Sequence, residues 1–355
     1  MSRVTQRQVA QEAAVSLSTV SAVLSGQADL RRIAPETASR VWEVSRQIGY
    51  QATRPKKNLT HAVGVILRSR VANFLGNPFY GDVFQWIEET VEDLGFHLVF
   101  SSRVESILQS GGVPRMLVQR RVDGLILLGQ LEAPLIERLL AFAVPAVCVN
   151  FEAGPNLTCV IRDGVEEARL AMEHVLALGH TRVAYLTSGL GSQHSRSREE
   201  GYRRCLPQGT RPIVLRGEGG DVEHGQAAMT EHLAAHDGQP SFRCLVAEND
   251  LLAVGAIRAL GHAGFRVPYD ISVVGGGGVT VPHWNGPRLT TTVVDRATMG
   301  RMAARLLVGT IQEDAGPVRV VLPSRLVAGE TTTAPRPPER VPAAAGAALT
   351  AQPEG

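Results

Sequence analysis

From residue 62 onward, short apolar runs alternate with stretches of helical periodicity, and this alternation constrains the fold more than any other feature of the chain. The runs are rich in Val, Ile and Leu without polar alternation, which is typical of strands buried on both faces of a parallel sheet. Strands are predicted at 63–67, 96–100, 124–128, 146–149, 183–187, 244–247 and 271–274, and helices at 84–94, 166–178 and 251–263. We therefore expect an α/β body of two doubly wound parallel-sheet lobes, with a ligand crevice at the carboxyl ends of the strands.

The amino-acid composition excludes several classes of protein. The chain has 355 residues, of which 44% are hydrophobic and 20% charged, so it can bury a large core and is not disordered as a whole. It has no apolar run of about 18 residues and a polar N-terminus, so we expect a cytoplasmic protein that does not enter a membrane. The four cysteines lack metal-type spacing, so neither zinc, nor disulfides, nor a cofactor is expected.

Catalytic signatures are also missing from the sequence. It contains no nucleophile elbow and no phosphate loop. The carboxylate pairs Glu88-Glu89 and Glu166-Glu167 fall in helical patterns, where we expect them on solvated faces. An enzyme is therefore not expected.

The charge is concentrated at the N-terminus. The first 60 residues hold nine Arg or Lys against four Asp or Glu, whereas the rest of the chain is slightly acidic. Such a basic segment favours binding to a polyanion, because cations near phosphates release condensed counterions. A solvated basic face with no partner is the alternative that charge alone leaves open.

Three short helices are predicted within this basic segment. Thr5 with Gln8 forms a capping-box pattern, Ser16 can cap a second helix, and Pro35 with Glu36 opens a third that Gly49 ends. The apolar stripes are Val9, Ala10 and Ala13, then Val20, Val23 and Leu24, then Val41, Val44 and Ile48, which leaves Leu17, Ser18, Ser21 and Ala22 off the buried face of the second helix. Three helices around one small core are the arrangement of a helix-turn-helix unit.

The residues of this head resemble a known family. The stretches Val4-Thr5, Val9-Ala10, Val15-Ser16, Thr19-Val20-Ser21, Val23-Leu24 and Ile48-Gly49-Tyr50 closely resemble the DNA-binding domain of the lactose-repressor and galactose-repressor (LacI/GalR) family of transcriptional regulators. The resemblance implies that the second helix enters the major groove and that Leu17, Ser18 and Ala22 read bases. It also places Thr5, Ser16, Thr19 and Ser21 at the DNA. Ala14 stands where the family commonly has a turn glycine, which is costly if the backbone there is left-handed.

The same resemblance implies a hinge over 51–61 that folds on DNA. Leu59 has the spacing of the family leucine that enters the minor groove, and Lys56 and Lys57 would face phosphates. The hinge is atypical, since Ala52-Thr53 replaces the usual Pro-Asn and Pro55 lies inside it. The alternative is that Leu59 only leads into the first strand.

The body, residues 62–333, resembles the periplasmic-binding-protein-like effector domain of that family. Its landmarks are Asn77-Pro78-Phe79-Tyr80, Val122-Asp123-Gly124, Leu178-Gly179-His180, Gly201-Tyr202, Asn249-Asp250, Val267-Pro268 and Ser272-Val273-Val274-Gly275. The resemblance implies effector contacts from Phe79, Tyr80, Asp163, Arg198, Asn249 and Asp250, a set that suits a sugar. Asp163 and Asn249 could instead be helix N-caps. Gly276-Gly277-Gly278 replaces the expected aromatic and acidic side chains. Either the ligand is larger or is bound elsewhere, with His283 and Trp284 as substitutes, or the protein has lost its response to an effector.

Together these patterns predict a DNA-binding transcriptional regulator, with a repressor as the expected type, that binds a near-palindromic operator as a homodimer. A small-molecule effector, a sugar or sugar derivative, would bind between the lobes. We expect residues 1–50 to form the helix-turn-helix domain and the Pro- and Ala-rich residues 334–355 to be a disordered tail. The alternative is a cytoplasmic solute-binding or sensor protein with a vestigial DNA-binding head.

Overall fold

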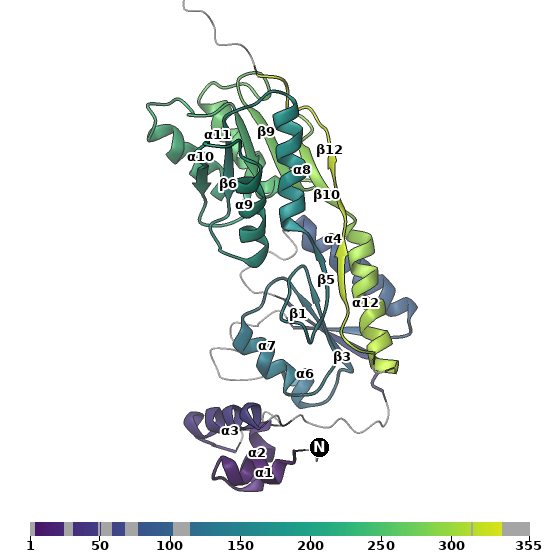
Figure 1. The fold of residues 1–355 in the computed structure, drawn as a ribbon. Helices are drawn as coiled ribbons and strands as arrows, with labels where there is room; N and C mark the ends of the chain where they lie inside the picture. The colour runs from purple at the N-terminus through teal and green to yellow at the C-terminus, as the bar shows by residue number, and fades with distance from the viewer. Residues whose placement is uncertain are drawn as a thin grey trace, which may run out of the picture.

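The computed structural model describes residues 4–24, 31–48, 50, 59–67, 77–101, 114–313 and 315–335. Within these ranges a small helical head lies beside the first lobe of a two-lobed body (Figure 1). The ring of Trp42 in the head lies 6.1 Å from that of Phe142 in the first lobe. Lys56, Lys57 and residues 336–355 lie outside the described residues. No helix of the described part is both long enough and apolar enough to cross a bilayer.

The head contains the three predicted helices, α1 (Gln6–Glu12), α2 (Leu17–Leu24) and α3 (Pro35–Gln47). The capping box is confirmed, because the Thr5 side chain accepts from the Gln8 amide while the Gln8 side chain accepts from the Thr5 amide. The apolar stripes meet in one core, whose fully buried members are Val9, Ala13, Val20 and Val41. Ala14, in the turn between α1 and α2, has a φ of +51°. The turn therefore does require the left-handed backbone that an alanine adopts at a cost.

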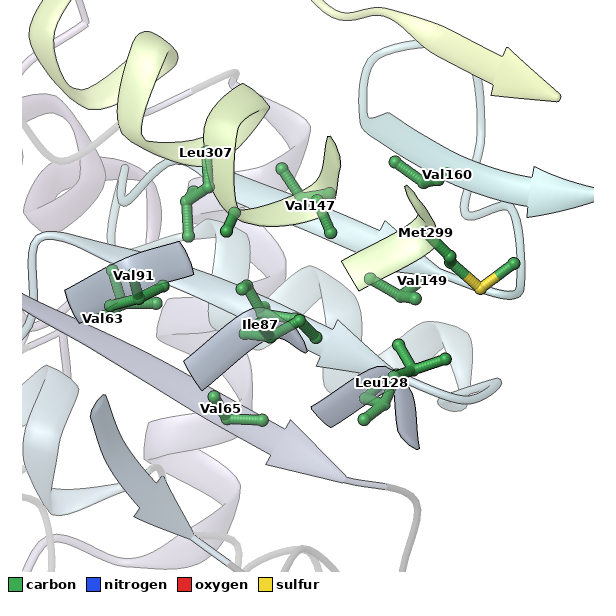
Figure 2. Close-up of a cluster of buried hydrophobic side chains, with 14 of the residues drawn as sticks. Val63, Val65, Ile87, Val91, Leu128, Val147, Val149, Val160, Met299 and Leu307 are labelled. Atoms are coloured by element: carbon green, nitrogen blue, oxygen red, sulfur yellow. The ribbon is translucent and has the colours of Figure 1, made fainter. Parts of the chain in front are cut away.

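The first lobe is built on a parallel sheet with strand order β11-β5-β4-β3-β1-β2 among the described residues. The strands are β1 (Ala62–Leu67), β2 (His97–Ser101), β3 (Gly124–Leu128), β4 (Ala146–Val149), β5 (Thr158–Arg162) and β11 (Arg319–Leu322). Helices α4 (Pro78–Asp93) and α12 (Arg296–Glu313) cover one face, and α6 (Arg115–Val118) and α7 (Ala133–Leu140) the other. Figure 2 shows the first of these two cores, where side chains of β1, β3, β4 and β5 meet those of α4 and α12.

The second lobe repeats the arrangement with strand order β12-β10-β9-β8-β6-β7. The strands are β6 (Val183–Thr187), β7 (Ile213–Arg216), β8 (Cys244–Ala247), β9 (Ser272–Gly277), β10 (Thr290–Val294) and β12 (Ser324–Val327), of which only β12 runs antiparallel to its neighbour. Helices α8 (Gly164–Ala177) and α9 (Gln193–Cys205) cover one face, and α10 (Val222–Ala234) and α11 (Asp250–His262) the other. The predicted two doubly wound parallel-sheet lobes are confirmed.

The chain crosses between the lobes at three described places. It leaves β5 for α8 at residue 163, returns from β10 to α12 at residue 295, and crosses again between β11 and β12 at residue 323. The lobes also contact each other directly, because the Gln193 amide at the start of α9 donates to the Gln130 side chain at 2.7 Å and the Glu152 amide donates to the Gln193 side chain at 3.1 Å. The segments that follow β3 and β4 are thereby held against the second lobe.

Candidate DNA-binding and effector sites

The N-terminal half of α2 lies on an exposed surface of the head. Leu17 is 45% exposed, which is unusual for a leucine, and Ser18 and Ser21 are exposed beside it. They are exposed because Val20, Val23 and Leu24 turn the opposite face of the helix into the core. Apolar and hydroxyl side chains on an exposed helix are able to contact thymine methyls and base edges in a major groove.

Other predicted DNA-binding residues form the ends of the head helices. The Ser16 hydroxyl caps α2 by accepting from the Thr19 amide at 3.0 Å, and it also pairs with the hydroxyls of Ser18 at 2.7 Å and Thr19 at 2.8 Å. Thr5 caps α1. Leu59 lies just before β1 and is 43% exposed. The roles of these side chains at DNA stay predictions.

Ala22 departs from the prediction that it lies off the buried face of α2. It is only 2% exposed, although it does not belong to the apolar core of the head. Helical periodicity shows which face packs against the core but not what covers the opposite face. In this conformation Ala22 offers no surface to a duplex.

Between the lobes, two buried arginines share one buried carboxylate. Glu167 of α8 is 1% exposed and accepts from Nε and Nη2 of Arg198, in α9, at 2.9 and 2.7 Å. Nη1 of Arg162, at the end of β5, lies 3.4 Å from the other oxygen of Glu167, which also accepts from the Ser324 hydroxyl. The prediction that Glu166-Glu167 lies on a solvated face is therefore wrong for Glu167, because α8 packs this position against α9.

Arg162 connects this ion cluster to the first lobe. Its guanidinium lies over the Phe79 ring at 4.3 Å, a cation–π contact. Its Nε donates to the Asn150 side chain at 3.1 Å, and Asn150 donates in turn to the Tyr80 hydroxyl at 3.0 Å. Phe79 and Tyr80 meet edge to face at the start of α4. The predicted effector residues Phe79 and Tyr80 thus lie against Arg162, a cation that sequence reasoning did not single out.

The electrostatics of the cluster follow from burial and from the shared carboxylate. Burial lowers the pKa of Arg162 to about 10, and Glu167 only partly opposes this. Burial also acts to lower the pKa of Arg198, but Glu167, Tyr185 and Glu248 together outweigh it and the pKa is raised. Burial, followed by Arg162 and Arg198, lowers the pKa of His194 well below its ordinary value, so His194 is neutral at pH 7. Arg162 is therefore the less compensated of the two cations.

The glycine run at the end of β9 has a geometric reason. A Cβ on Gly276 would lie 2.9 Å from the Glu248 carbonyl oxygen and 3.2 Å from Nη1 of Arg198. The buried carboxylate of Asp250 lies against Gly275 and accepts from the Thr291 hydroxyl and the Val279 amide, at 2.5 and 2.7 Å. Asp250 and Arg198 therefore occupy the space in which side chains at positions 275 and 276 would lie.

The remaining predicted effector residues are placed differently. Asp163 accepts from the Val165 and Glu166 amides as the N-cap of α8, and Asn249 accepts from the Leu252 amide as the N-cap of α11. Both fit the N-cap alternative. Trp284 packs on Leu251, Val254 and Val281, and its indole donates to the Pro287 carbonyl at 3.0 Å. The structure brings together Phe79, Tyr80, Arg198 and Asp250, and adds Asn150, Arg162, Glu167 and His194, which the sequence analysis missed.

The sequence contains a partial signal for one of the missed residues, Arg162. Arg162 precedes Asp163 directly, at the end of an apolar run, where a charged residue must either leave the sheet or find a partner. Nothing in the sequence indicates that this partner lies on α8. Among the described residues, no three His, Cys, Asp or Glu side chains group in a way that could hold a metal ion.

Comparison with known proteins agrees with this two-part architecture. Residues 5–52 match the family of bacterial regulatory proteins known as the lacI family, and residues 172–332 match the periplasmic binding protein-like domain. The ribose operon repressor of Halalkalibacterium halodurans is 26% identical over 330 residues, which cover 92% of this chain and 97% of that protein. The transcriptional repressor PurR of Photorhabdus laumondii is 28% identical over 89% of this chain and 94% of that protein.

Solved structures show the same likeness. A complex of the transcriptional regulator CelR with cellobiose is 28% identical, with a TM-score of 0.71 over 93% of this chain and 100% of that chain. The lac repressor dimer bound to operator and the anti-inducer ONPF is 27% identical, with a TM-score of 0.67 over 94% of this chain and 100% of that chain. The named relatives are transcriptional regulators and not enzymes. With the capped helical head, the two-lobed body and these matches to both parts, the chain belongs to the lacI family of bacterial regulatory proteins.

Proposed function

We propose that the protein is a transcriptional repressor that binds a near-palindromic operator as a homodimer and responds to a small molecule between its lobes. The observation that carries this proposal is the exposed N-terminal half of α2, with Leu17 and Ser18, on a capped three-helix head. One head reaches a single half-site, so two-fold symmetry supplies the second.

Within the head, Leu17, Ser18 and Ser21 are the side chains available for base contacts. Thr5, Ser16, Thr19, Lys56 and Lys57 would contact the backbone, and Leu59 the minor groove. Ala22 is buried, so it can contact DNA only in a conformation in which it is exposed. A Leu and small hydroxyls favour thymine methyls and single hydrogen bonds over bidentate recognition of a purine, so the operator sequence should reflect this.

In the body, the effector would lie among Phe79, Tyr80, Arg198 and Asp250, with Asp163, Asn249 and Trp284 as weaker candidates. A sugar or sugar derivative is supported by the relatives, one named for ribose and another solved with cellobiose. A ligand that prefers the closed lobes shifts the population towards them, because it can bias an equilibrium only by its differential affinity for the two states. The movement reaches the heads through the first lobe, on which they are carried.

The proposed function assigns a role to each part of the chain and a compartment to the protein. Residues 1–50 would form the DNA-binding domain, 51–61 the hinge, and 62–333 the effector-binding and dimerisation domain. Because the operator of a bacterial regulator lies on cytoplasmic DNA, the protein acts in the cytoplasm.

The test is a titration of the purified full-length protein against DNA from upstream of its own gene and against the same DNA scrambled, at several salt concentrations. We expect tighter binding to the natural sequence, with an affinity that falls as salt rises. A variant lacking residues 1–60 should lose this binding. Equal affinity for both DNAs at every salt concentration would refute the proposal.

A further inference from the structure

The buried carboxylates between the lobes already accept hydrogen bonds from protein donors. Each oxygen of Glu167 accepts from protein donors, namely Arg198, Arg162 and Ser324. Glu248 accepts from the Thr187, Ser188 and Ser195 hydroxyls and from the Ser188 amide, at 2.7 to 3.0 Å. The oxygens of Asp250 accept from Thr291 and Val279. Sugar hydroxyls that donate would therefore compete with existing bonds.

Hydrogen-bond donors, in contrast, remain available at the same place. Arg162 uses Nε and Nη1, and its Nη2 donates to none of the described residues. Arg198 uses Nε and Nη2, and within the described chain its Nη1 likewise has no acceptor. The Tyr80 hydroxyl accepts from Asn150, which leaves its own proton free to donate. This site thus offers N–H and O–H groups to a ligand that brings acceptors.

The geometry of these donors suits an oxyanion. Two guanidinium groups, with side chains 8% and 4% exposed, share the carboxylate of Glu167, and the Arg162 contact is the longer one at 3.4 Å. Asp250 and Glu248 also act on Arg162 and Arg198, respectively, so what the site offers a ligand is unused N–H groups and not an excess of positive charge. A guanidinium suits the paired oxygens of carboxylate or phosphate. Gly276 and Gly277 lie next to both guanidinium groups, since a Cβ there would be 3.2 Å from Arg198 Nη1 and 3.9 Å from Arg162 Nη1, respectively. No side chain of the run blocks an oxygen that approaches these two groups.

We propose that the effector of this protein carries an oxyanion, a carboxylate or a phosphate, which Arg162 and Arg198 bind together from the two lobes with help from the Tyr80 hydroxyl. The inference rests on the proposed function, because it names the ligand class of the same cleft. A sugar acid or sugar phosphate satisfies both. Arg162 is then a specificity-determining residue, and it closes the lobes on the anion because it extends from β5 while Arg198 extends from α9.

The test measures thermal stabilisation and calorimetric binding of the full-length protein with four probes at matched ionic strength in chloride. The probes are inorganic phosphate, glucuronate, glucose 6-phosphate and glucose, so that phosphate, carboxylate and the neutral sugar are compared. We expect at least one anionic probe to raise the melting temperature in a saturable way, and glucose to have no such effect. Glucuronate and glucose 6-phosphate distinguish the two oxyanions from each other.

Two variants and a control assign the effect to the cleft. Arg162→Gln should weaken binding of the anionic probe by about ten- to a hundredfold, as expected for a lost charged hydrogen bond. Arg162→Lys keeps the charge and should weaken binding less, so it reports on the site even if the first variant folds poorly. Arg169→Gln, in an exposed ion pair on α8, should bind like the wild type.

Three results would overturn the inference: glucose binding as tightly as its anionic relatives, no stabilisation by any anion beyond chloride, or the same stabilisation in Arg162→Gln as in the wild type. Operator binding is measured separately, on protein without probe. If the operator is bound but no anion stabilises the protein, the ligand class is wrong and the regulator proposal stands. If an Arg162-dependent anion effect is found without operator binding, the regulator proposal is the one that fails.

Discussion

Replacement of Glu167 by glutamine should destabilise the body strongly. The change removes the one carboxylate that Arg162 and Arg198 share, at a site where Glu167 is 1% exposed. Breaking a buried ion pair on one side costs about 3–5 kcal/mol, because a charge is left buried without compensation. Since the amide oxygen of glutamine can still accept from Arg198, we expect the lower end, about 3 kcal/mol. For a domain of about 150–250 residues, this loss of unfolding free energy corresponds to a fall of about 6–12 °C in melting temperature.

The assay is calorimetric unfolding of Glu167→Gln and of a matched control, Glu173→Gln, which removes an exposed carboxylate from the same helix and should change stability by less than about 0.5 kcal/mol. The pH dependence adds a second reading. Burial acts to raise the pKa of Glu167, but Arg162 and Arg198 outweigh it and the folded-state pKa is lowered. The stabilisation is therefore present above the ordinary glutamate pKa, about 4.3, and is lost as the pH falls below it. A melting temperature within about 1 °C of the wild type at pH 7 would refute this account of the cluster.

Three further predictions concern the head and the glycine run. Ala14→Gly should stabilise the head by about 0.5–1 kcal/mol, because Ala14 is exposed at a φ of +51°, whereas Gln11→Gly within α1 should destabilise it by about as much; hydrogen exchange of the Val9 and Val20 amides measures both. Leu17→Ala should weaken binding to the operator by about tenfold and leave binding to scrambled DNA nearly unchanged, measured by fluorescence anisotropy, and an equal loss on both DNAs would argue against base contact. Gly276→Ala should cost about 1–3 kcal/mol in thermal unfolding because its Cβ meets the Glu248 carbonyl oxygen, while Gly261→Ala, in α11 with nothing within 4 Å, should be neutral or stabilising.

Several strands that are buried on both faces follow from local patterns, although β5 and β10, which are also mostly buried, do not. The strands predicted at 124–128, 146–149, 183–187 and 244–247 have the same bounds in the structure. Strands β5, β7, β10, β11 and β12 were not singled out, and β7, β11 and β12 are only partly buried. A strand with exposed positions lacks the continuous apolar run that identifies its neighbours.

In the candidate sites, too, the features that depend on local sequence were predicted, whereas those that depend on tertiary packing were not. The sequence identified Thr5 and Ser16 as caps, and it predicted that Leu17 and Ser18 lie outside the core, because caps and helical faces are decided within a few residues. It also indicated Phe79, Tyr80, Arg198 and Asp250 for the cleft through a family resemblance. It placed Glu167 on a solvated face and left Ala22 uncovered, and both are buried.

What the sequence by itself determined is therefore the alternation of helices and strands, the three-helix head and the two-lobed body, since these depend on periodicities of two to four residues. Only the tertiary structure decided that Arg162 from β5, Glu167 from α8 and Arg198 from α9 meet, and that glycine is needed beside them. These groups are up to 36 positions apart in the chain and belong to three different elements. Periodicity tells which face of an element is buried, but which faces meet depends on how the chain crosses between the lobes.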